Sequence, residues 1–121
     1  MSRTDELNRI LRAMLTSTPE VEAAALITED ALVIASALPQ HIEELRVAGM
    51  TATMLNLGTR VAKDLERGTI EQILIKGAKG YVILVGAAEG TLLVVMTTHE
   101  AKLGLIFLDL KRAVQDISKI I

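Results

Sequence analysis

Few side chains in this sequence are of a type and spacing that suit catalysis. Neither of the two histidines, His41 and His99, is followed by a second one at the spacing of a helical metal motif. The absence of cysteine excludes disulfides and thiolate metal sites. No nucleophile stands beside a base at a recognisable spacing. The segment 77–80, Gly-Ala-Lys-Gly, lacks the ending and the following helix of a phosphate-binding loop. The sequence therefore predicts no catalytic residue, no metal site and no cofactor.

The side chains best suited to recognition are three arginines, Arg46, Arg60 and Arg67, in one polar strip of a predicted helix. Thr53 and Asp64 complete the strip. A guanidinium pairs well with carboxylates and phosphates, so the strip is a candidate binding site for a partner protein. An arginine supplied to a GTPase is a sharper form of the hypothesis, but no spacing singles out one arginine. A solvated polar strip remains the alternative.

The helix that carries this strip is predicted over His41 to Arg67 and has two apolar stripes. At about 100° per residue, the larger side chains form one stripe: Val47, Met50, Met54, Leu57, Val61 and Leu65. Smaller side chains form a second, roughly opposite stripe: Leu45, Ala48, Ala52, Leu55, Thr59 and Ala62. The surface helix of a monomer needs one apolar stripe. We therefore expect a second copy of the chain to cover the other, unless the helix lies centrally in the core.

The predicted dimer interface combines this helix with one strand. The small-residue stripe, with Gly49 beside it, permits close approach of a second helix, while the larger stripe fills grooves on the sheet. The opposite assignment stays open. The strand at 70–76 either adds to its mate edge to edge or is a charged edge that prevents such pairing. The predicted interface residues are Leu45, Ala48, Gly49, Ala52, Leu55, Ile70, Gln72 and Leu74.

The remaining elements follow from apolar periodicity and turn signals. A helix is predicted from Ser2 or Thr4 to about residue 16, and a last helix over 101–120, capped by Thr98. Strands are predicted at 21–28, 31–37, 70–76, 81–87 and 91–97. The short connections force neighbouring strands to be antiparallel. The order α-β-β-α-β-β-β-α predicts an α/β sandwich of the α+β class, with a five-stranded antiparallel sheet between helices, in a single domain over 1–121.

The composition excludes several classes of protein. A net charge of −2 without a basic block argues against a nucleic-acid-binding protein, and an aromatic content of 2% leaves almost no platform for base stacking. No stretch approaches the roughly 18 apolar residues of a membrane span. The amphipathic start is not a signal peptide. We therefore expect a soluble cytoplasmic protein that does not bind nucleic acid and does not insert into a membrane.

Three segments together resemble the roadblock/dynein light-chain family. They are 103–113 (Leu-Gly-Leu-Ile-Phe-Leu-Asp-Leu-Lys-Arg-Ala), 31–36 (Ala-Leu-Val-Ile-Ala-Ser) and 65–81, which contains Glu-Gln-Ile-Leu-Ile-Lys-Gly. The resemblance runs from about Leu7 to Ile120. It implies a profilin-like architecture and a homodimer or heterodimer, in which third strands pair edge to edge and the long helices meet on one face of the sheet. Ala31 departs from the pattern, since many members carry glycine there.

The resemblance also implies a partner, because single-domain bacterial and archaeal members look like regulators of GTPases encoded nearby. We therefore predict a non-enzymatic homodimer that binds a small Ras-like GTPase as a regulator or scaffold. One alternative is a structural adaptor subunit of a larger motor or signalling complex. Another is a small-molecule sensor domain, against which the scarcity of aromatic and polar residues in the predicted interior argues.

Overall fold

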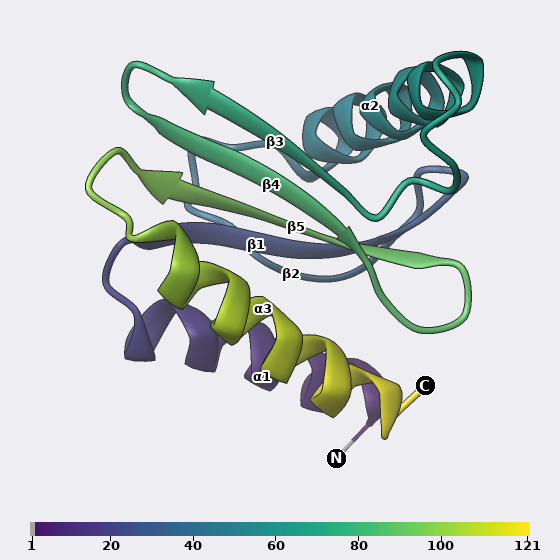
Figure 1. Cartoon of the computed structure of the whole chain (residues 1–121). Helices are drawn as coiled ribbons and strands as arrows, with labels where there is room; N and C mark the ends of the chain where they lie inside the picture. Colours follow the sequence, from purple (N-terminus) through teal and green to yellow (C-terminus); the bar gives the residue numbers. More distant parts are fainter. Residues whose placement is uncertain (1) are drawn as a thin grey trace.

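The computed structural model describes residues 2–121 as three helices and five strands (Figure 1). The order predicted from the sequence is confirmed. The elements are α1 (Arg3–Ser17), β1 (Val21–Thr28), β2 (Val33–Ala37), α2 (Glu44–Asp64), β3 (Gln72–Gly77), β4 (Gly80–Gly86), β5 (Thr91–Thr98) and α3 (Leu103–Ser118).

The strands form one antiparallel sheet in the order β2-β1-β5-β4-β3. The helices α1 and α3 lie side by side on one face, and α2 lies on the other (Figure 1). The central strand β5 is almost wholly buried, while most residues of β3 are exposed. The predicted α+β sandwich is confirmed, and β3 is an edge strand as its mixed composition suggested.

The face covered by α1 and α3 holds the larger core. Its helices contribute side chains at helical spacing and its strands contribute every second residue, which is how an amphipathic helix packs on a sheet. The fully buried large side chains there are Leu7, Leu11, Leu26, Ile83, Leu93, Ile106, Leu110 and Ile117. The hydroxyl of Thr18 donates to Asp109 at 2.5 Å, which joins the end of α1 to α3. This face is closed within one chain.

The face covered by α2 holds a smaller core made largely of short side chains. Its buried members are Ala25, Ile27, Val47, Ala48, Leu84, Leu92 and Val94. Only three residues of α2 are buried, Val47, Ala48 and Thr51, although the helix has 21 residues. The helix therefore covers the sheet mainly with its first half. Its C-terminal end projects from the body of the molecule, at the upper right of Figure 1.

Local details at the element ends differ from the sequence prediction. Ser2 caps α1 in a reciprocal capping box with Asp5, as predicted. Thr98 does not cap α3: it ends β5, and Lys102 occupies the N-cap position without a side-chain bond. Ala31 has φ of 71°, the left-handed conformation that glycine adopts most easily. The first hairpin therefore keeps the backbone shape that the resemblance assigns to glycine.

The turn between β3 and β4 requires glycine for a steric reason. Gly80 has φ of 155°, and a Cβ atom there would overlap the carbonyl oxygen of Thr97 on the neighbouring strand β5. The segment 77–80 is thus a hairpin turn, as its flanking strands predicted.

Candidate functional site: the outer face of α2 and the free edge of β3

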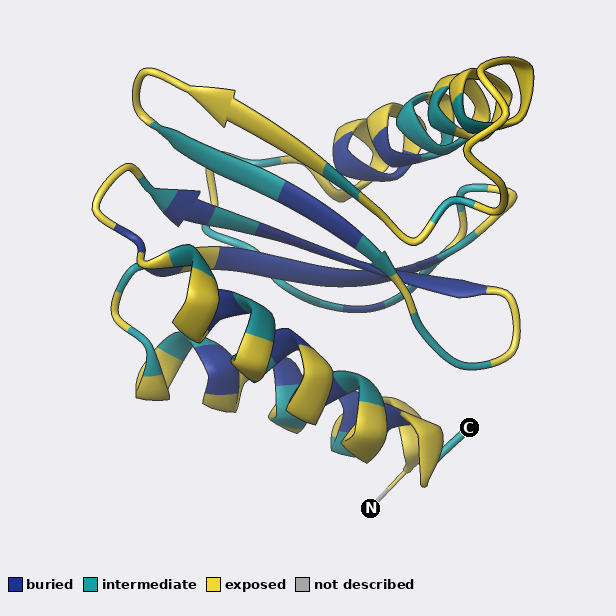
Figure 2. Ribbon diagram, viewed as in Figure 1, coloured by how far each residue is buried: buried dark blue, intermediate teal, exposed yellow. Residues whose placement is uncertain are grey.

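The outer face of α2 exposes a row of large apolar side chains. Met50, Leu57, Val61 and Leu65, just past the last turn, are all about half exposed or more, and Leu57 retains 61% of its accessible surface. Figure 2 shows the buried residues of α2 confined to the side that faces the sheet. Isolated exposed apolar residues are common, but a continuous row of them on one helix usually marks an interaction surface.

The side of α2 that faces the sheet lies between the two stripes predicted from the sequence. It contains Val47 and Met54 of the larger stripe, Ala48 and Leu55 of the smaller stripe, and Thr51 between them. Neither stripe packs on the sheet as a whole. The angular positions of the residues around the helix did not show this, because both stripes border the side of α2 that faces the sheet.

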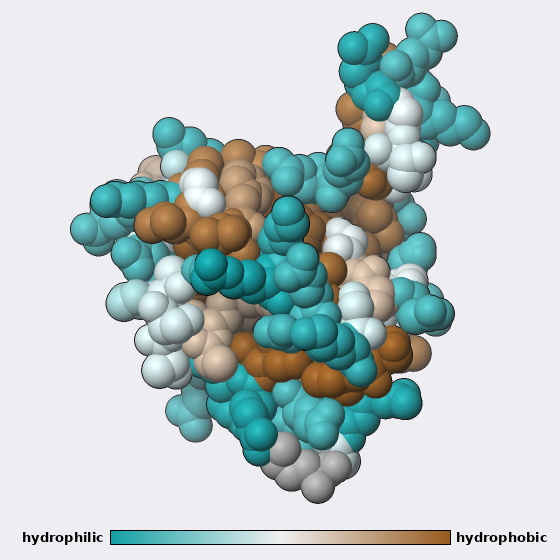
Figure 3. Space-filling view, turned by 60° about the horizontal axis from the view of Figure 1, so that its bottom comes forward, coloured by the Kyte–Doolittle hydropathy of each residue, from teal (hydrophilic) through white to brown (hydrophobic). Residues whose placement is uncertain are grey.

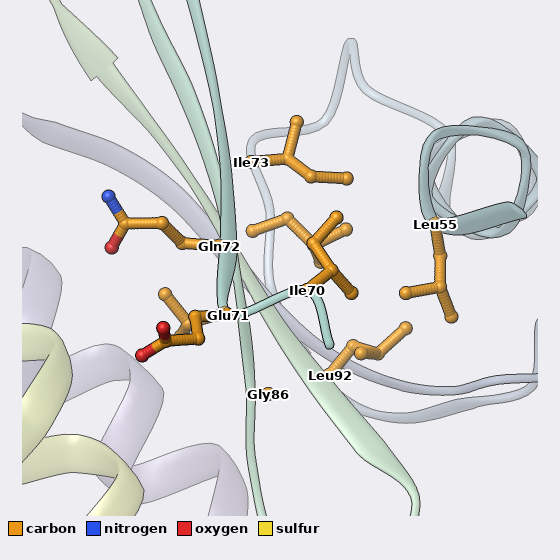
Figure 4. A pocket seen from close by; sticks show the side chains of 9 residues that line it. Leu55, Ile70, Glu71, Gln72, Ile73, Gly86 and Leu92 are labelled. Atoms are coloured by element: carbon orange, nitrogen blue, oxygen red, sulfur yellow. The ribbon is translucent and has the colours of Figure 1, made fainter. Parts of the chain in front are cut away.

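Two residues assigned to the dimer interface therefore pack against the chain's own core. Ala48 is only 1% exposed and packs against the sheet. Leu55 points toward Ile70 and Leu92, into a small apolar pocket beneath α2 (Figure 4). The prediction that Ala48 faces a second copy conflicts with its burial, whereas Leu55 is half-buried and its part in a dimer interface stays a prediction. The small volume of Ala48 serves close packing of α2 on its own sheet.

The other predicted interface residues differ in how open they are. Leu45 is 82% exposed, Leu74 is 42% exposed, and Gly49 and Gln72 are also exposed. Ala52 and Ile70 are half-buried.

Ile70 precedes β3 and packs against Gly58 of α2, a residue that the sequence analysis did not single out. A Cβ atom at Gly58 would lie 2.7 Å from Cδ1 of Ile70 and 2.8 Å from Cδ1 of Ile73. This glycine therefore lets the second half of α2 approach the start of β3. A glycine inside an otherwise helical pattern was the available signal.

The edge strand β3 pairs with β4 on one side and is free on the other. Its side chains alternate between the two faces of the sheet. Ile73 and Ile75 lie on the α2 face, while Gln72 lies on the α3 face. Leu74 shares the face of Gln72 by the same alternation. The free edge thus adjoins the exposed row of α2 through two isoleucines.

A pocket of about 500 Å³ lies beside the first half of α2, between this helix and the strands. Its floor comes from three strands, through Ile75, Val82, Val94 and Met96, and its wall from α2, through Val47, Gly49, Met50, Thr51, Thr53 and Met54. None of these side chains carries a charge. We call this space the α2 pocket.

A family model described as the Roadblock/LC7 domain matches residues 7–97. The chain belongs to the Roadblock/LC7 family. An uncharacterized protein of Methanocaldococcus jannaschii is 36% identical over 103 residues, 85% of this chain and 90% of that protein. Among solved structures, Myxococcus xanthus MglB has a TM-score of 0.88 at 21% identity, over 99% of this chain and 90% of that one. A Roadblock/LC7 domain from Streptomyces avermitilis has a TM-score of 0.86 at 18% identity, over 93% and 94%. The two structures share the fold.

In this Roadblock/LC7 domain the predicted polar strip is exposed along its whole length. Arg46, Thr53, Arg60 and Asp64 lie on α2 and are all exposed, and Thr53 also lines the α2 pocket. Arg67 follows the helix, which ends at Asp64 and not at Arg67 as predicted, and its Nε donates to the carbonyl oxygen of Leu65 at 3.0 Å. The strip therefore runs beside the exposed apolar row and past its end.

Within residues 2–121, no group of three or more histidine, cysteine, aspartate or glutamate residues is arranged to hold a metal ion. None of the helices described there is both long enough and apolar enough to span a membrane. The features that the structure does bring together are apolar surface and a free strand edge.

Proposed function

We propose that the chain forms a homodimer through β3 and α2 and that the dimer binds a small Ras-like GTPase as a regulator or scaffold. The observation that carries the dimer is the row of exposed apolar residues on α2 beside an unpaired strand edge. Both features leave favourable contacts unmade in a single chain, since unpaired edges and apolar patches tend to be covered. One symmetric contact covers both.

The backbone geometry of β3 favours one register for such a pair. The turn closes on the Gly77–Gly80 pair, so positions alternate from there along the hairpin. Backbone groups of Gly77, Ile75 and Ile73 are expected to point to β4, and those of Lys76, Leu74 and Gln72 to the free edge. Opposite residues of an antiparallel pair lie on the same face of the sheet. A two-fold axis between the two strands therefore places two copies of the same residue opposite each other.

If the axis lies between the two copies of Leu74, the backbone groups of all three outward-pointing residues form hydrogen bonds with the second strand. This arrangement places the two copies of Leu74 opposite each other, and Gln72 opposite Lys76 of the partner subunit. It also sets Ile73 beside Ile75 of the partner subunit on the α2 face. The second halves of both α2 helices, whose ends project from the body of each chain (Figure 1), are then expected to meet over this apolar seam.

A single cysteine tests this register, because the chain contains none. Hydrogen-bonded partners have Cα atoms about 5.5 Å apart, within the range that a disulfide spans. We expect Leu74→Cys to form a covalent dimer on mild oxidation. The matched control, Gln72→Cys on the same strand and face, should stay uncrosslinked because its partner is a lysine. A dimeric Leu74→Cys variant that does not crosslink would contradict this register, and a monomer at micromolar concentration would contradict the dimer.

The GTPase part of the proposal is supported by family membership and by the exposed polar strip with its three arginines. Nothing in the strip is arranged as a catalytic centre, so we propose that it acts by contact with the switch loops of the GTPase. The test is capture of bound proteins by the purified dimer, followed by nucleotide hydrolysis measured with and without it. A changed hydrolysis rate that is lost in Arg60→Ala supports regulation. Capture of a GTPase without any change in rate supports a scaffold. Capture of other proteins alone favours an adaptor subunit.

A further inference from the structure

We propose that Asn8 closes the second free edge of the sheet, at β2, so that copies of this chain add to one another only at β3. That this leaves a finite dimer rests on the proposed function. The role of Asn8 itself is tested independently of the dimer.

The sheet has two edge strands, β2 and β3. The unpaired backbone groups of an edge strand are a template for a further strand. If both edges paired with further copies of the chain, every added copy would present a new open edge, and the assembly would grow without closing. A chain that stops at a dimer through β3 therefore needs a feature that keeps further strands away from β2.

Asn8 of α1 supplies that feature. Its Oδ1 accepts from the backbone N–H of Ser36 at 3.0 Å, and both residues are half-buried. The pairing of β2 with β1 skips Ile34, so the regular part of β2 runs from Ala35 to Ala37. Backbone groups of successive residues in a strand point to alternate sides. Within this regular part, Ser36 therefore provides the N–H that points away from β1, and Asn8 occupies it.

The side chain of Ser36 is held from the opposite face of the sheet. Its Oγ donates to Oε1 of Glu44, the first residue of α2, at 2.5 Å. Ser36 thus joins α1 to α2 across the free side of β2, which keeps its N–H directed at Asn8. The carboxylate of Glu44 also places a charge at this edge, and charged side chains discourage strand addition.

The edge at β3 has no comparable bond. Within residues 2–121, the backbone N–H groups that donate to side chains are those of Ser2, Asp5, Leu32 and Ser36. None of these residues belongs to β3. The two edges of one sheet therefore differ: a side chain occupies the outward donor at β2, and the outward donors at β3 are open to a second copy.

Variants of Asn8 test the bond. Asn8→Leu keeps a side chain of similar size and removes the acceptor, which frees the N–H of Ser36 for a further strand. In sedimentation velocity, we expect its mass to rise with protein concentration to at least about twofold above that of the parent, because one new edge contact joins two parent assemblies. Asn8→Asp keeps an oxygen in the same place and should sediment like the parent. Equal sedimentation of both variants would overturn the proposal.

Two controls show whether the assembly uses β2. Ala13→Leu adds a leucine to the exposed side of α1, in the groove beside α3, and should sediment like the parent. Adding Ser36→Pro to Asn8→Leu removes the freed donor, and proline is tolerated in edge strands, so the double variant should return to the parent mass. Assembly of either control would mean that added apolar surface is sufficient, which overturns the proposal.

Leu57→Glu separates this inference from the proposed dimer. In that background, where association at β3 is weakened, Asn8→Leu should form dimers through β2 and nothing larger. If the parent chain is a monomer, Asn8→Leu alone should likewise form dimers, which contradicts the proposed dimer and supports the role of Asn8. A dimeric parent whose Asn8→Leu variant stays dimeric contradicts the role of Asn8 alone.

Discussion

The two faces of the sheet are closed to different degrees. On one face, α1 and α3 cover the strands, and large side chains such as Leu11, Ile106 and Ile117 are fully buried. On the other face, α2 buries three of its own residues and leaves four large apolar side chains of its outer row in solvent. Figure 3, which looks toward the side of α1 and α3, shows the end of α2 standing clear of the body.

This difference separates the residues that fold the chain from those that connect it to others. Burial of apolar surface is the main favourable term in folding, so the α1–α3 face carries most of the stability of a single chain. The outer row of α2 adds little to that stability and keeps its apolar surface for association. If substitutions on both faces changed the free energy of unfolding and the self-association to the same extent, the two faces would not differ in this way.

The largest effect is expected at Ala48, an α2 residue that the sequence assigned to the dimer and that the structure buries against the sheet. Ala48→Glu buries a carboxylate among apolar side chains, with a cost of about 3 kcal/mol or more. We expect the variant to be largely unfolded, as measured by circular dichroism during urea titration. A variant that is folded but monomeric would show that Ala48 lies in the dimer interface and not in the core.

The closed face should respond strongly to a smaller change. Leu11 is fully buried between α1 and the sheet, and Leu11→Ala is expected to lower the free energy of unfolding by about 2–5 kcal/mol. Leu57→Ala, the matched truncation on the exposed row, should cost under about 0.5 kcal/mol in the dissociated chain. Urea titrations at a low and a high protein concentration distinguish the two. An equal loss at both concentrations would mean that the single chain already covers Leu57.

Substitutions in the exposed row of α2 should change self-association and leave the fold of the single chain intact. Leu57→Glu places a charge at the proposed seam, and we expect self-association to weaken at least about tenfold, or 1.4 kcal/mol. The fold is expected to persist because the side chain is exposed. Sedimentation equilibrium measures the change, with Thr4→Glu on the exposed first turn of α1 as the control. If both variants associate like the parent, α2 is not part of the interface.

The fold was predictable because most elements have one apolar face and clear ends. In α1, apolar residues recur at helical spacing between a Ser2 cap and Pro19, and only one packing is consistent with them. The strands are separated by connections too short for a parallel crossover, which fixes antiparallel neighbours. At the first hairpin, the resemblance marked Ala31 as a departure from glycine, and the structure gives this residue the left-handed conformation that glycine adopts most easily.

The orientation of α2 was not predictable in the same way. Its sheet-facing line contains Thr51, a polar residue, and draws Val47 from one stripe and Ala48 from the other. That choice depends on where the helix crosses the sheet, and the close approach of Gly58 to Ile70 and Ile73 is a contact between distant segments that a helical wheel does not show. The α2 pocket was not predictable either, because its lining combines residues of α2 with residues of three strands, and the periodicity of one helix does not show which strands it adjoins.

The smallest effect is expected at Gly49, and it tests which side of α2 a second helix approaches. A Cβ atom there meets nothing within 4 Å, so Gly49→Ala should stabilise the exposed helix by about 0.5–1 kcal/mol through reduced backbone entropy in the unfolded chain. If the exposed row of Leu57 and Val61 is the seam, self-association should stay unchanged while the midpoint of urea unfolding rises. If instead a second helix packs closely over Gly49, as the sequence predicted, the added methyl group should raise the dissociation constant. The two measurements on one variant therefore separate the side of α2 that meets its mate from the side left open to a third protein.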